Sequence, residues 1–184
     1  MIAVYAKAGD RRAAEHCAAL RERSVPCGMV GTEYGLASMI HKVPFLFIGT
    51  GCEAVIDSFH NAIPDHKIIR SYEMLCPEKL LEQLKNVYGL DFLQLSGSGI
   101  RFVEDQLYFF GNRISLTDCE KSILKLLLLC RGTYFTADEI AAFCLHGNSS
   151  SSVAVHIHNN NAKNVATTTE RIVYSKRYCG YRVK

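Results

Sequence analysis

The sequence has no apolar run that approaches the length of a membrane-spanning helix. Its longest apolar stretches are Val43–Ile48 and Leu126–Cys130, whereas a helix needs roughly 18 apolar residues to cross a bilayer. The first residues, MIAVYAKAGDRR, contain neither a long apolar core nor a small-residue cleavage site, so we expect no signal peptide. The expected protein is therefore cytoplasmic and makes no contact with a membrane.

The cysteines lack the C-x-x-C motif and any paired spacing. Eight are present, at positions 17, 27, 52, 76, 119, 130, 144 and 179. Disulfide frameworks are typical of short exported chains. Without an export signal, we interpret these cysteines as reduced residues that pack in the interior.

The composition is that of an ordinary globular protein, with 48% hydrophobic and 21% charged residues among 184. Disordered and low-complexity chains are thereby excluded, and the length suits one domain or two small ones. Charge is uneven, because residues 1–92 carry a net −1 and residues 93–184 a net +4. Residues 163–184 contain six basic side chains and one acid. This basic end favours a polyanionic partner, with a solvated tail as the alternative.

Strand-like and helix-like segments alternate through the first half of the chain. The expected strands are Ile2–Ala6, Val25–Val30, Val43–Ile48 and Lys67–Ser71. The expected helices are a segment capped by Asp10 that runs to about Arg23, Tyr34–His41, Glu53–Ala62, and a segment that opens with Cys76-Pro77. Alternation of this kind predicts a small parallel sheet with right-handed crossovers.

Gly49-Thr50-Gly51-Cys52 follows the most apolar expected strand. In a parallel sheet this edge forms the usual ligand crevice, and the next helix can hold an anion at its N-terminus. The segment lacks the lysine of a P-loop and the spacing of a dinucleotide fingerprint. A tight strand-to-helix turn is the preferred interpretation.

The order of elements in residues 1–90 resembles the receiver domain of response regulators. VPFLFIGTG is similar to a receiver strand with its hydroxyl residue at Thr50, and HKIIRSYEMLCPEKLLEQLKNV to the last receiver strand and helix. About four strand–helix units are present, one fewer than in a full receiver. The resemblance therefore implies a shortened, degenerate receiver-like domain.

The receiver resemblance breaks at the residues that phosphorylation requires. Lys7 stands after the first strand, where the family has an acidic pair that holds Mg²⁺. Neither Val30-Gly31-Thr32 nor Ile48-Gly49-Thr50 supplies the phosphoacceptor Asp. A lysine repels a divalent cation, whose preferred ligands are oxygens. We therefore predict no aspartyl phosphorylation and a role for this domain in dimerisation or signal input.

The second half begins near the turn-rich segment Gly89–Gly99 and then changes its pattern. IRFVEDQLYFFGNRISLT predicts two strands, with turn residues at Glu104-Asp105 and again at Gly111-Asn112. T-x-x-E capping boxes at Thr117–Glu120 and Thr136–Glu139 predict two helix starts. VAVHIHNNNAKNV then predicts a third helix, and RIVYSKRYCGYRVK a hairpin. Three helices and a terminal hairpin are typical of a winged helix-turn-helix, which reads two adjacent grooves of DNA.

Residues 92–184 resemble the OmpR/PhoB-type winged-helix domain. The matching motifs are ISLT with Glu120, Ile123-Leu124 with Leu127-Leu128, Thr136 with Glu139-Ile140, VAVHI at 153–157, and GYRV at 180–183. The predicted fold class is thus an α/β N-terminal domain with a small parallel sheet (residues 1–90), followed by an α+β winged helix-turn-helix domain (residues 91–184).

The resemblance implies which residues contact DNA. Val155, His158 and Asn159 would face base edges, and Arg177 would enter the minor groove from the wing. The other residues expected at the DNA are those facing phosphates and their neighbours, namely Ser151, Ser152, His156, Asn161, Lys163 and Lys176.

The expected recognition helix departs from the family at HNNNAKN. Asn160 occupies the position of a buried leucine, so its amide should cap an early helix end or find a backbone partner. Because asparagine has a low helix propensity, we expect a helix shorter than usual. Lys163 is the one cation of this stretch, which predicts a modest affinity for phosphates and a modest salt dependence.

Two other chemistries, a metal site and a cysteine nucleophile, are alternatives to DNA binding. Cys144-x-His146 and His156-x-His158 suggest a metal site, but residues two apart on a helix point in different directions. Cys52 with His60 suggests a nucleophile, but no third orienting residue is evident. Packing is the preferred interpretation of these residues, and Tyr72, Tyr88 and Tyr108 are interpreted as edges of the core.

The sequence as a whole predicts a transcription regulator of the response-regulator type that is not an enzyme and needs no cofactor. Its expected partners are double-stranded DNA, a second copy of the chain bound through the N-terminal domain, and RNA polymerase. The alternative is a protein- or ligand-binding module of the same fold whose DNA affinity is weak or lost, which the asparagine run favours.

Overall fold

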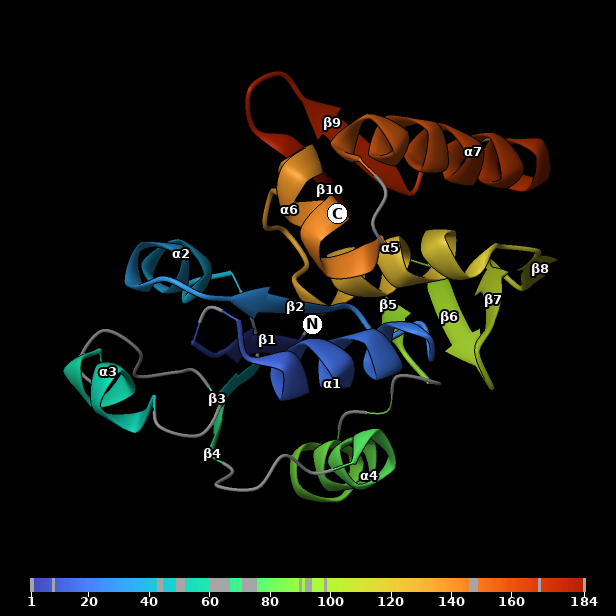
Figure 1. The fold of residues 1–184 in the computed structure, drawn as a ribbon. Coiled ribbons are helices and arrows are strands. Elements are labelled where there is room, and N and C mark those ends of the chain that lie inside the picture. The colour runs from blue at the N-terminus through green and yellow to red at the C-terminus, as the bar shows by residue number, and fades with distance from the viewer. Residues whose placement is uncertain are drawn as a thin grey trace.

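The computed structural model describes residues 2–7, 9–42, 45–48, 52–59, 67–70, 76–89, 91, 94–97, 99–145, 149–168 and 170–183. In the first half the elements are β1 (Ile2–Tyr5), α1 (Arg11–Arg21), β2 (Cys27–Val30), α2 (Glu33–Met39), β3 (Phe45–Ile48), α3 (Glu53–Ser58), β4 (Lys67–Arg70) and α4 (Pro77–Tyr88). In the second half they are β5 (Ser96–Gly97), β6 (Ile100–Val103), β7 (Gln106–Phe109), β8 (Asn112–Ile114), α5 (Asp118–Leu129), α6 (Ala137–Cys144), α7 (Ser150–Thr168), β9 (Val173–Lys176) and β10 (Gly180–Val183) (Figure 1).

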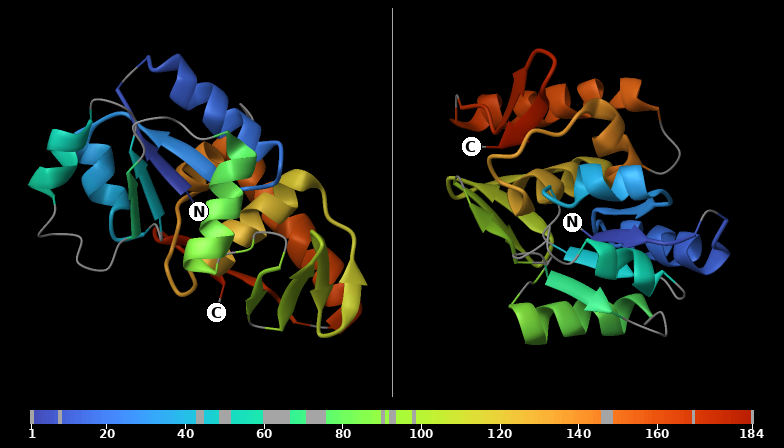
Figure 2. Two further views of the ribbon diagram at one scale, coloured as in Figure 1. Left: turned by 90° about the horizontal axis from the view of Figure 1, so that it is seen from below. Right: turned by 90° about the vertical axis from the view of Figure 1, so that its left-hand side faces the viewer.

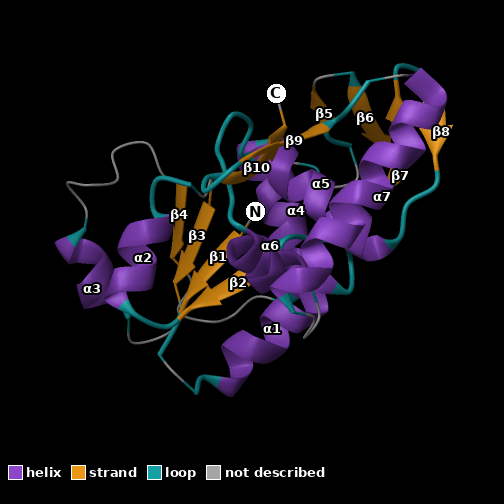
Figure 3. Ribbon diagram, turned by 90° about the horizontal axis from the view of Figure 1, so that it is seen from above, coloured by secondary structure: helices purple, strands orange, loops and turns teal. Residues whose placement is uncertain are grey.

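The first half contains a parallel sheet with the strand order β2-β1-β3-β4. Strand β1 pairs with both β2 and β3, so that Ile2 lies opposite Cys27 on one side and Phe45 on the other. Helices α2 and α3 lie on one face of this sheet, and α1 and α4 lie on the other (Figures 2 and 3). The prediction of a small parallel sheet with about four strand–helix units is confirmed at this level.

The helix starts of the first half are fixed by local capping. The Asp10 carboxylate accepts a hydrogen bond from the Ala13 N–H (3.1 Å), and the Thr32 hydroxyl accepts one from the Gly35 N–H (3.0 Å). Pro77 opens α4, and Gly89 ends it with a positive φ of 66°. The side chains of Asp10 and Thr32 satisfy a free N–H group of the first turn, and Pro77 has no N–H group to satisfy, which explains where these helices begin.

The second half opens with an antiparallel sheet, β5-β6-β7-β8. The prediction of two strands in residues 100–117 is wrong, because three strands lie in this segment. The turn at Glu104-Asp105, where both residues have positive φ, separates β6 from β7, and the turn at Phe110-Gly111 separates β7 from β8. The first turn lies where the sequence indicates one, and the second lies one residue before the indicated Gly111-Asn112, so the third strand is the part that the prediction lacks.

Helices α5 and α6 and the terminal hairpin complete the fold. Both predicted capping boxes are confirmed, at Thr117 with Glu120 and at Thr136 with Glu139. Strands β9 and β10 pair as an antiparallel hairpin. Phe135 exchanges two backbone hydrogen bonds with Tyr181 of β10, which joins the hairpin to the segment between α5 and α6. None of the described helices combines the length and apolar character needed to cross a bilayer.

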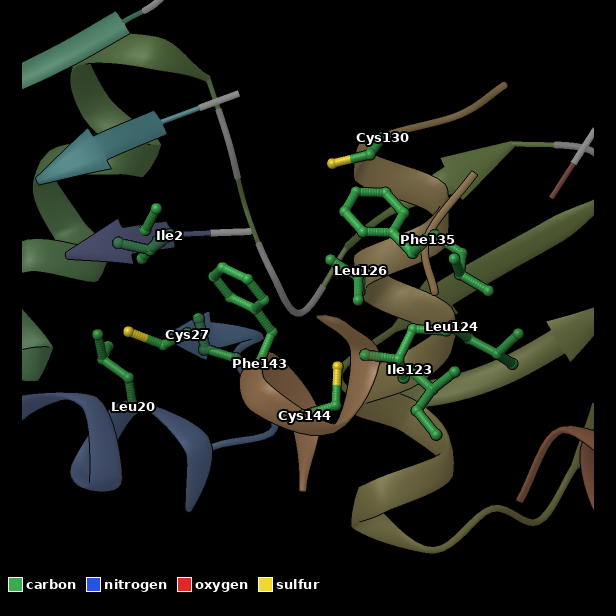
Figure 4. Close-up of a cluster of buried hydrophobic side chains, with 14 of the residues drawn as sticks. Ile2, Leu20, Cys27, Ile123, Leu124, Leu126, Cys130, Phe135, Phe143 and Cys144 are labelled. Carbon is green, nitrogen blue, oxygen red and sulfur yellow. The ribbon is translucent and has the colours of Figure 1, made fainter. Parts of the chain in front are cut away.

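One continuous hydrophobic core joins the two halves. Helix α6 packs against β2, the edge strand of the parallel sheet. In Figure 4 the Phe143 ring of α6 lies between Ile2 and Cys27 on one side and Leu126 of α5 on the other. At the rim, Lys42 forms an ion pair with Glu139 of α6 (Nζ–Oε1, 2.5 Å). The second half is therefore held against the open edge of the sheet.

Candidate nucleic-acid interface

Helix α7 is the element on which most of the predicted DNA contacts fall. It spans Ser150–Thr168, 19 residues, so the prediction of a short recognition helix is wrong. Its inner face is formed by Val153, Ile157, Asn160 and Asn164, which are buried at helical spacing against α5 and α6. Burial of this face stabilises a helix whose asparagines alone would not support it, since packing contributes more than intrinsic propensity.

The outer face of α7 brings together the residues predicted to read bases. Val155, His158 and Asn159 are all exposed and follow one another at the spacing of a single helix face. Val155 is 58% exposed, which is unusual for a valine within a folded helix. Ser151 is exposed one turn earlier, whereas Ser152 and His156 are partly buried at the side of this face.

Asn161 is bound to the terminal hairpin formed by β9 and β10, which we call the wing, instead of pointing into solvent. Its Nδ2 donates to the Val173 carbonyl (2.9 Å), and its Oδ1 accepts from the Val173 N–H (3.1 Å). The side chain thus satisfies both backbone groups of the first residue of β9. We infer that Asn161 sets the position of the hairpin relative to α7, a role that sequence reasoning missed because it depends on a residue twelve positions away.

Lys163 also has a partner within the protein. Its Nζ lies 2.7 Å from the Glu120 carboxylate, which is 2% exposed. Burial by itself raises the pKa of Glu120, but hydrogen bonds from Lys163 and from the Thr117 N–H outweigh it, and the net pKa is lowered. The same carboxylate therefore caps α5 and neutralises the one lysine of α7.

Asn160 contradicts the expectation that its amide would cap a helix end or find a backbone partner. It lies in the middle of α7 and is 0% exposed. Neither its Oδ1 nor its Nδ2 has a hydrogen-bond partner in the described part of the chain. A buried amide without partners costs free energy, so this position weakens the helix that it helps to form.

The wing presents two exposed cations beside an exposed aromatic ring. Lys176 and Arg177 are both exposed, and the Arg177 guanidinium lies 4.8 Å from the centre of the Tyr178 ring. Tyr178 is 89% exposed and has a positive φ of 62°. The turn of the wing and helix α7 lie at the same end of the molecule, away from α1 and α4 (Figures 1 and 2).

A groove of about 260 Å³ lies between α7 and the segment that leads into β9. Its lining includes His158, Asn161 and Val165 from α7 together with Arg171. Arg171 is exposed and adds a cation beside α7, whose own lysine, Lys163, is paired with Glu120. Sequence reasoning missed Arg171 and Tyr178 as candidate site residues. Arg171 is one of the six basic residues of 163–184, so the basic composition of that segment was the signal that could have found it.

The alternative chemistries gain no support from the described residues. Within the described ranges, no three or more His, Cys, Asp or Glu side chains are grouped to hold a metal ion. Cys144 is buried, which raises the pKa of its thiol to about 12, and it behaves as a packing residue. Cys52 is likewise buried. Gly49–Gly51, His60, Tyr72 and His146 lie outside the described residues.

No family model matches this chain, and no curated protein sequence matches it either. Among solved structures, the response regulator AdeR DNA binding domain in complex with an intercistronic region is 20% identical, covers 48% of this chain and 96% of its own, and has a TM-score of 0.45. The DNA binding domain of CpxR from E. coli is 18% identical, covers 49% of this chain and 94% of its own, and has a TM-score of 0.41. DrrB, a Thermotoga maritima OmpR/PhoB homolog, is 14% identical, covers 100% of this chain and 98% of its own, and has a TM-score of 0.46. These similar structures are response regulators.

Because the TM-scores lie below 0.5, we take the function from the geometry of this chain.

Proposed function

We propose that this chain is a sequence-specific DNA-binding transcription regulator of the response-regulator type. Residues 91–184 bind double-stranded DNA, and residues 1–90 form a receiver-like domain that dimerises and works without aspartyl phosphorylation. One observation carries the DNA assignment: the exposed face of α7 and the cations of the wing lie at one end of the molecule. A helix and a hairpin in this arrangement suit adjacent grooves of a duplex.

The division of work between these residues follows from their chemistry. Val155, His158 and Asn159 face base edges, where the Asn159 amide can pair with adenine. Arg177 enters the minor groove from the wing. Its charge, together with those of Lys176 and Arg171, is attracted by the phosphates. Ser151, Ser152 and His156 lie where they can contact phosphates near the start of α7. Asn161 and Lys163 act inside the protein, because their polar atoms bind Val173 and Glu120.

Selection of duplexes from a random library, followed by fluorescence anisotropy on the enriched duplex, tests this function. Asn159→Ala should weaken binding by about 1–3 kcal/mol and relax the preference at one base pair. Arg177→Ala should weaken binding to all duplexes and reduce the salt slope by about 1. Lys79→Ala, an exposed lysine on α4 at the opposite end of the molecule, is the matched control and should change neither quantity. A library in which no site is enriched would overturn the proposal.

Phosphorylation independence is supported by the ends of β1 and β2. The exposed Lys7 follows β1, and Gly31 with the helix-capping Thr32 follows β2. Neither position offers a phosphoacceptor carboxylate. Incubation with acetyl phosphate and Mg²⁺ should leave the mass of the chain unchanged and its DNA affinity unaltered. A hydroxylamine-sensitive phosphate on the chain would refute this part of the proposal.

A protein- or ligand-binding module remains the second candidate, and one observation favours it. The exposed face of α7, within its described residues, presents valine, alanine, serine, histidine and asparagine side chains and no unpaired lysine or arginine. A helix that binds a duplex usually contributes cations to the phosphates. The same anisotropy titration separates the two candidates, because the module predicts weak or no binding that does not depend on the sequence of the duplex.

A further inference from the structure

Cys17 and Cys27 form a thiol pair at the point where the two halves of the molecule meet. Cys17 lies on α1 and Cys27 on β2, and their sulfur atoms are 3.2 Å apart, with the Cys27 thiol donating to Cys17 Sγ. Both side chains are buried, at 2% and 0% exposure, and both are free thiols. Most buried cysteines pack against carbon atoms, whereas here each sulfur faces another sulfur.

The surroundings of the pair distinguish its two members. The hydrogen bond from Cys27 lowers the pKa of Cys17, and the nearby Arg21 guanidinium acts in the same direction. Burial raises the pKa of Cys27, so this thiol keeps its proton. Cys17 is therefore the sulfur that ionises, and Cys27 is the partner placed to attack it once it is oxidised.

Arg21 connects this pair to the winged-helix half. Its Nε donates to the Cys27 carbonyl and its Nη2 donates to the Ala142 carbonyl of α6, both at 2.5 Å. The next residue of β2, Gly28, lies directly against the Phe143 ring of α6. A covalent bond between Cys17 and Cys27 would thus fix α1 to the strand on which α6 rests.

We propose that Cys17 and Cys27 are an oxidative modification site that closes to an intramolecular disulfide when a peroxide reaches it. The Cys17 thiolate attacks the peroxide O–O bond, which gives Cys17 sulfenic acid and releases hydroxide. The hydroxide takes the Cys27 proton and becomes the first water. The Cys27 thiolate then attacks the Cys17 sulfur and displaces hydroxide, which takes up the proton that Cys17 released on ionising and becomes the second water. Two thiols and one hydrogen peroxide become one disulfide and two waters, with the peroxide as the two-electron oxidant.

Closure needs a movement that the fold can supply. The sulfurs must approach from 3.2 Å to about 2.05 Å, and we expect rotation of the two cysteine side chains to supply this movement. Because both sulfurs are buried, peroxide reaches them when the α1–β2 layer opens, and we expect oxidation to become faster in low concentrations of urea.

Peptide mapping of the full chain tests the site directly. The reduced protein is treated with excess hydrogen peroxide, its remaining thiols are alkylated in denaturant, and it is digested with trypsin without reductant. Cleavage after Arg21 and Arg23 separates the two cysteines, so the disulfide appears as peptide 13–21 linked to peptide 24–42, lighter by two hydrogen atoms than the sum of the two. The oxidised chain should remain monomeric on a non-reducing gel and unfold at a higher temperature than the reduced chain.

Two variants control the experiment. Cys17→Ala should abolish the linked peptide and the oxidant-dependent rise in unfolding temperature, whereas Cys130→Ala, at another buried cysteine, should retain both. Wild-type protein in which residues 17 and 27 are both recovered alkylated, or stop as separate sulfinic acids, would overturn the proposal. So would a disulfide that lowers the unfolding temperature, because it would mean that the native fold opposes closure.

Discussion

Asn160 and Glu120 are both buried polar side chains of the second half of the chain, and they differ in their hydrogen-bond partners. Glu120 has Lys163 and the Thr117 N–H as partners, whereas the Asn160 amide has none among the described residues. A satisfied buried carboxylate contributes to stability, and an unsatisfied amide subtracts from it. These two residues therefore give predictions of opposite sign.

Asn160→Leu should stabilise the protein. The substitution removes an amide that has no hydrogen-bond partner and places an apolar side chain of similar size in the core, which is worth about 1–3 kcal/mol. Urea denaturation measures the change in the free energy of unfolding. Asn159→Leu, at the exposed neighbour, is the matched control and should stay within about 0.5 kcal/mol of wild type. A destabilised Asn160→Leu would show that the amide is satisfied in solution.

Glu120 should make stability depend on acid pH. Its folded pKa is lowered, so the stabilisation is complete above the unfolded value of about 4.3 and is lost as the pH falls through the folded value. Glu120→Gln keeps the side chain that a capping box needs and removes the charge. The variant should be less stable than wild type at pH 7, and the difference should shrink between pH 5 and pH 3. Glu82→Gln, on the exposed side of α4, should follow wild type throughout.

At the scale of elements, the junction between α7 and β9 decides whether helix and wing act together. Asn161→Ala removes both hydrogen bonds to Val173, so the hairpin should lose its fixed position while its own strand pairing survives. Hydrogen exchange of the Val173 amide should become at least several-fold faster, with a smaller effect on Phe135. Asn161→Asp, which keeps the acceptor and loses the donor, should give an intermediate rate; equal rates in all three proteins would contradict the positioning role.

Sequence reasoning succeeded where structure is local and failed where it depends on distant contacts. The Thr117 and Thr136 capping boxes, the Asp10 cap and the Pro77 start all involve residues within one turn, and each begins a helix as predicted. The length of α7 was mispredicted because helix propensity ignores the burial of Val153 and Ile157. Val155, His158 and Asn159 lie on one exposed face of α7, as their helical spacing in the sequence indicates. Their contact with DNA stays a prediction.

At the scale of the whole molecule, the contact between α6 and β2 makes the two halves share one core. No sequence pattern predicts this contact, because Gly28 and Phe143 are far apart in the chain and each fits its own strand or helix without reference to the other. A Cβ atom at Gly28 would lie 2.6 Å from Phe143 Cδ1, so only glycine allows the ring to sit on the strand. The ion pair between Lys42 and Glu139 of α6 adds a second connection between the two halves.

Gly28→Val should therefore push α6 away from the sheet and lower stability by about 1–3 kcal/mol, the usual result of overpacking a core. Combining it with Phe143→Ala should recover part of that loss, so that the two changes are less damaging together than the sum of each alone. Gly31→Ala is the matched control, because its nearest neighbour would be the Ala6 carbonyl at 3.9 Å. Urea denaturation followed by circular dichroism measures all four variants. Strict additivity of Gly28→Val and Phe143→Ala would mean that the two halves do not share this contact in solution, because residues that touch are coupled and residues that are separated are not.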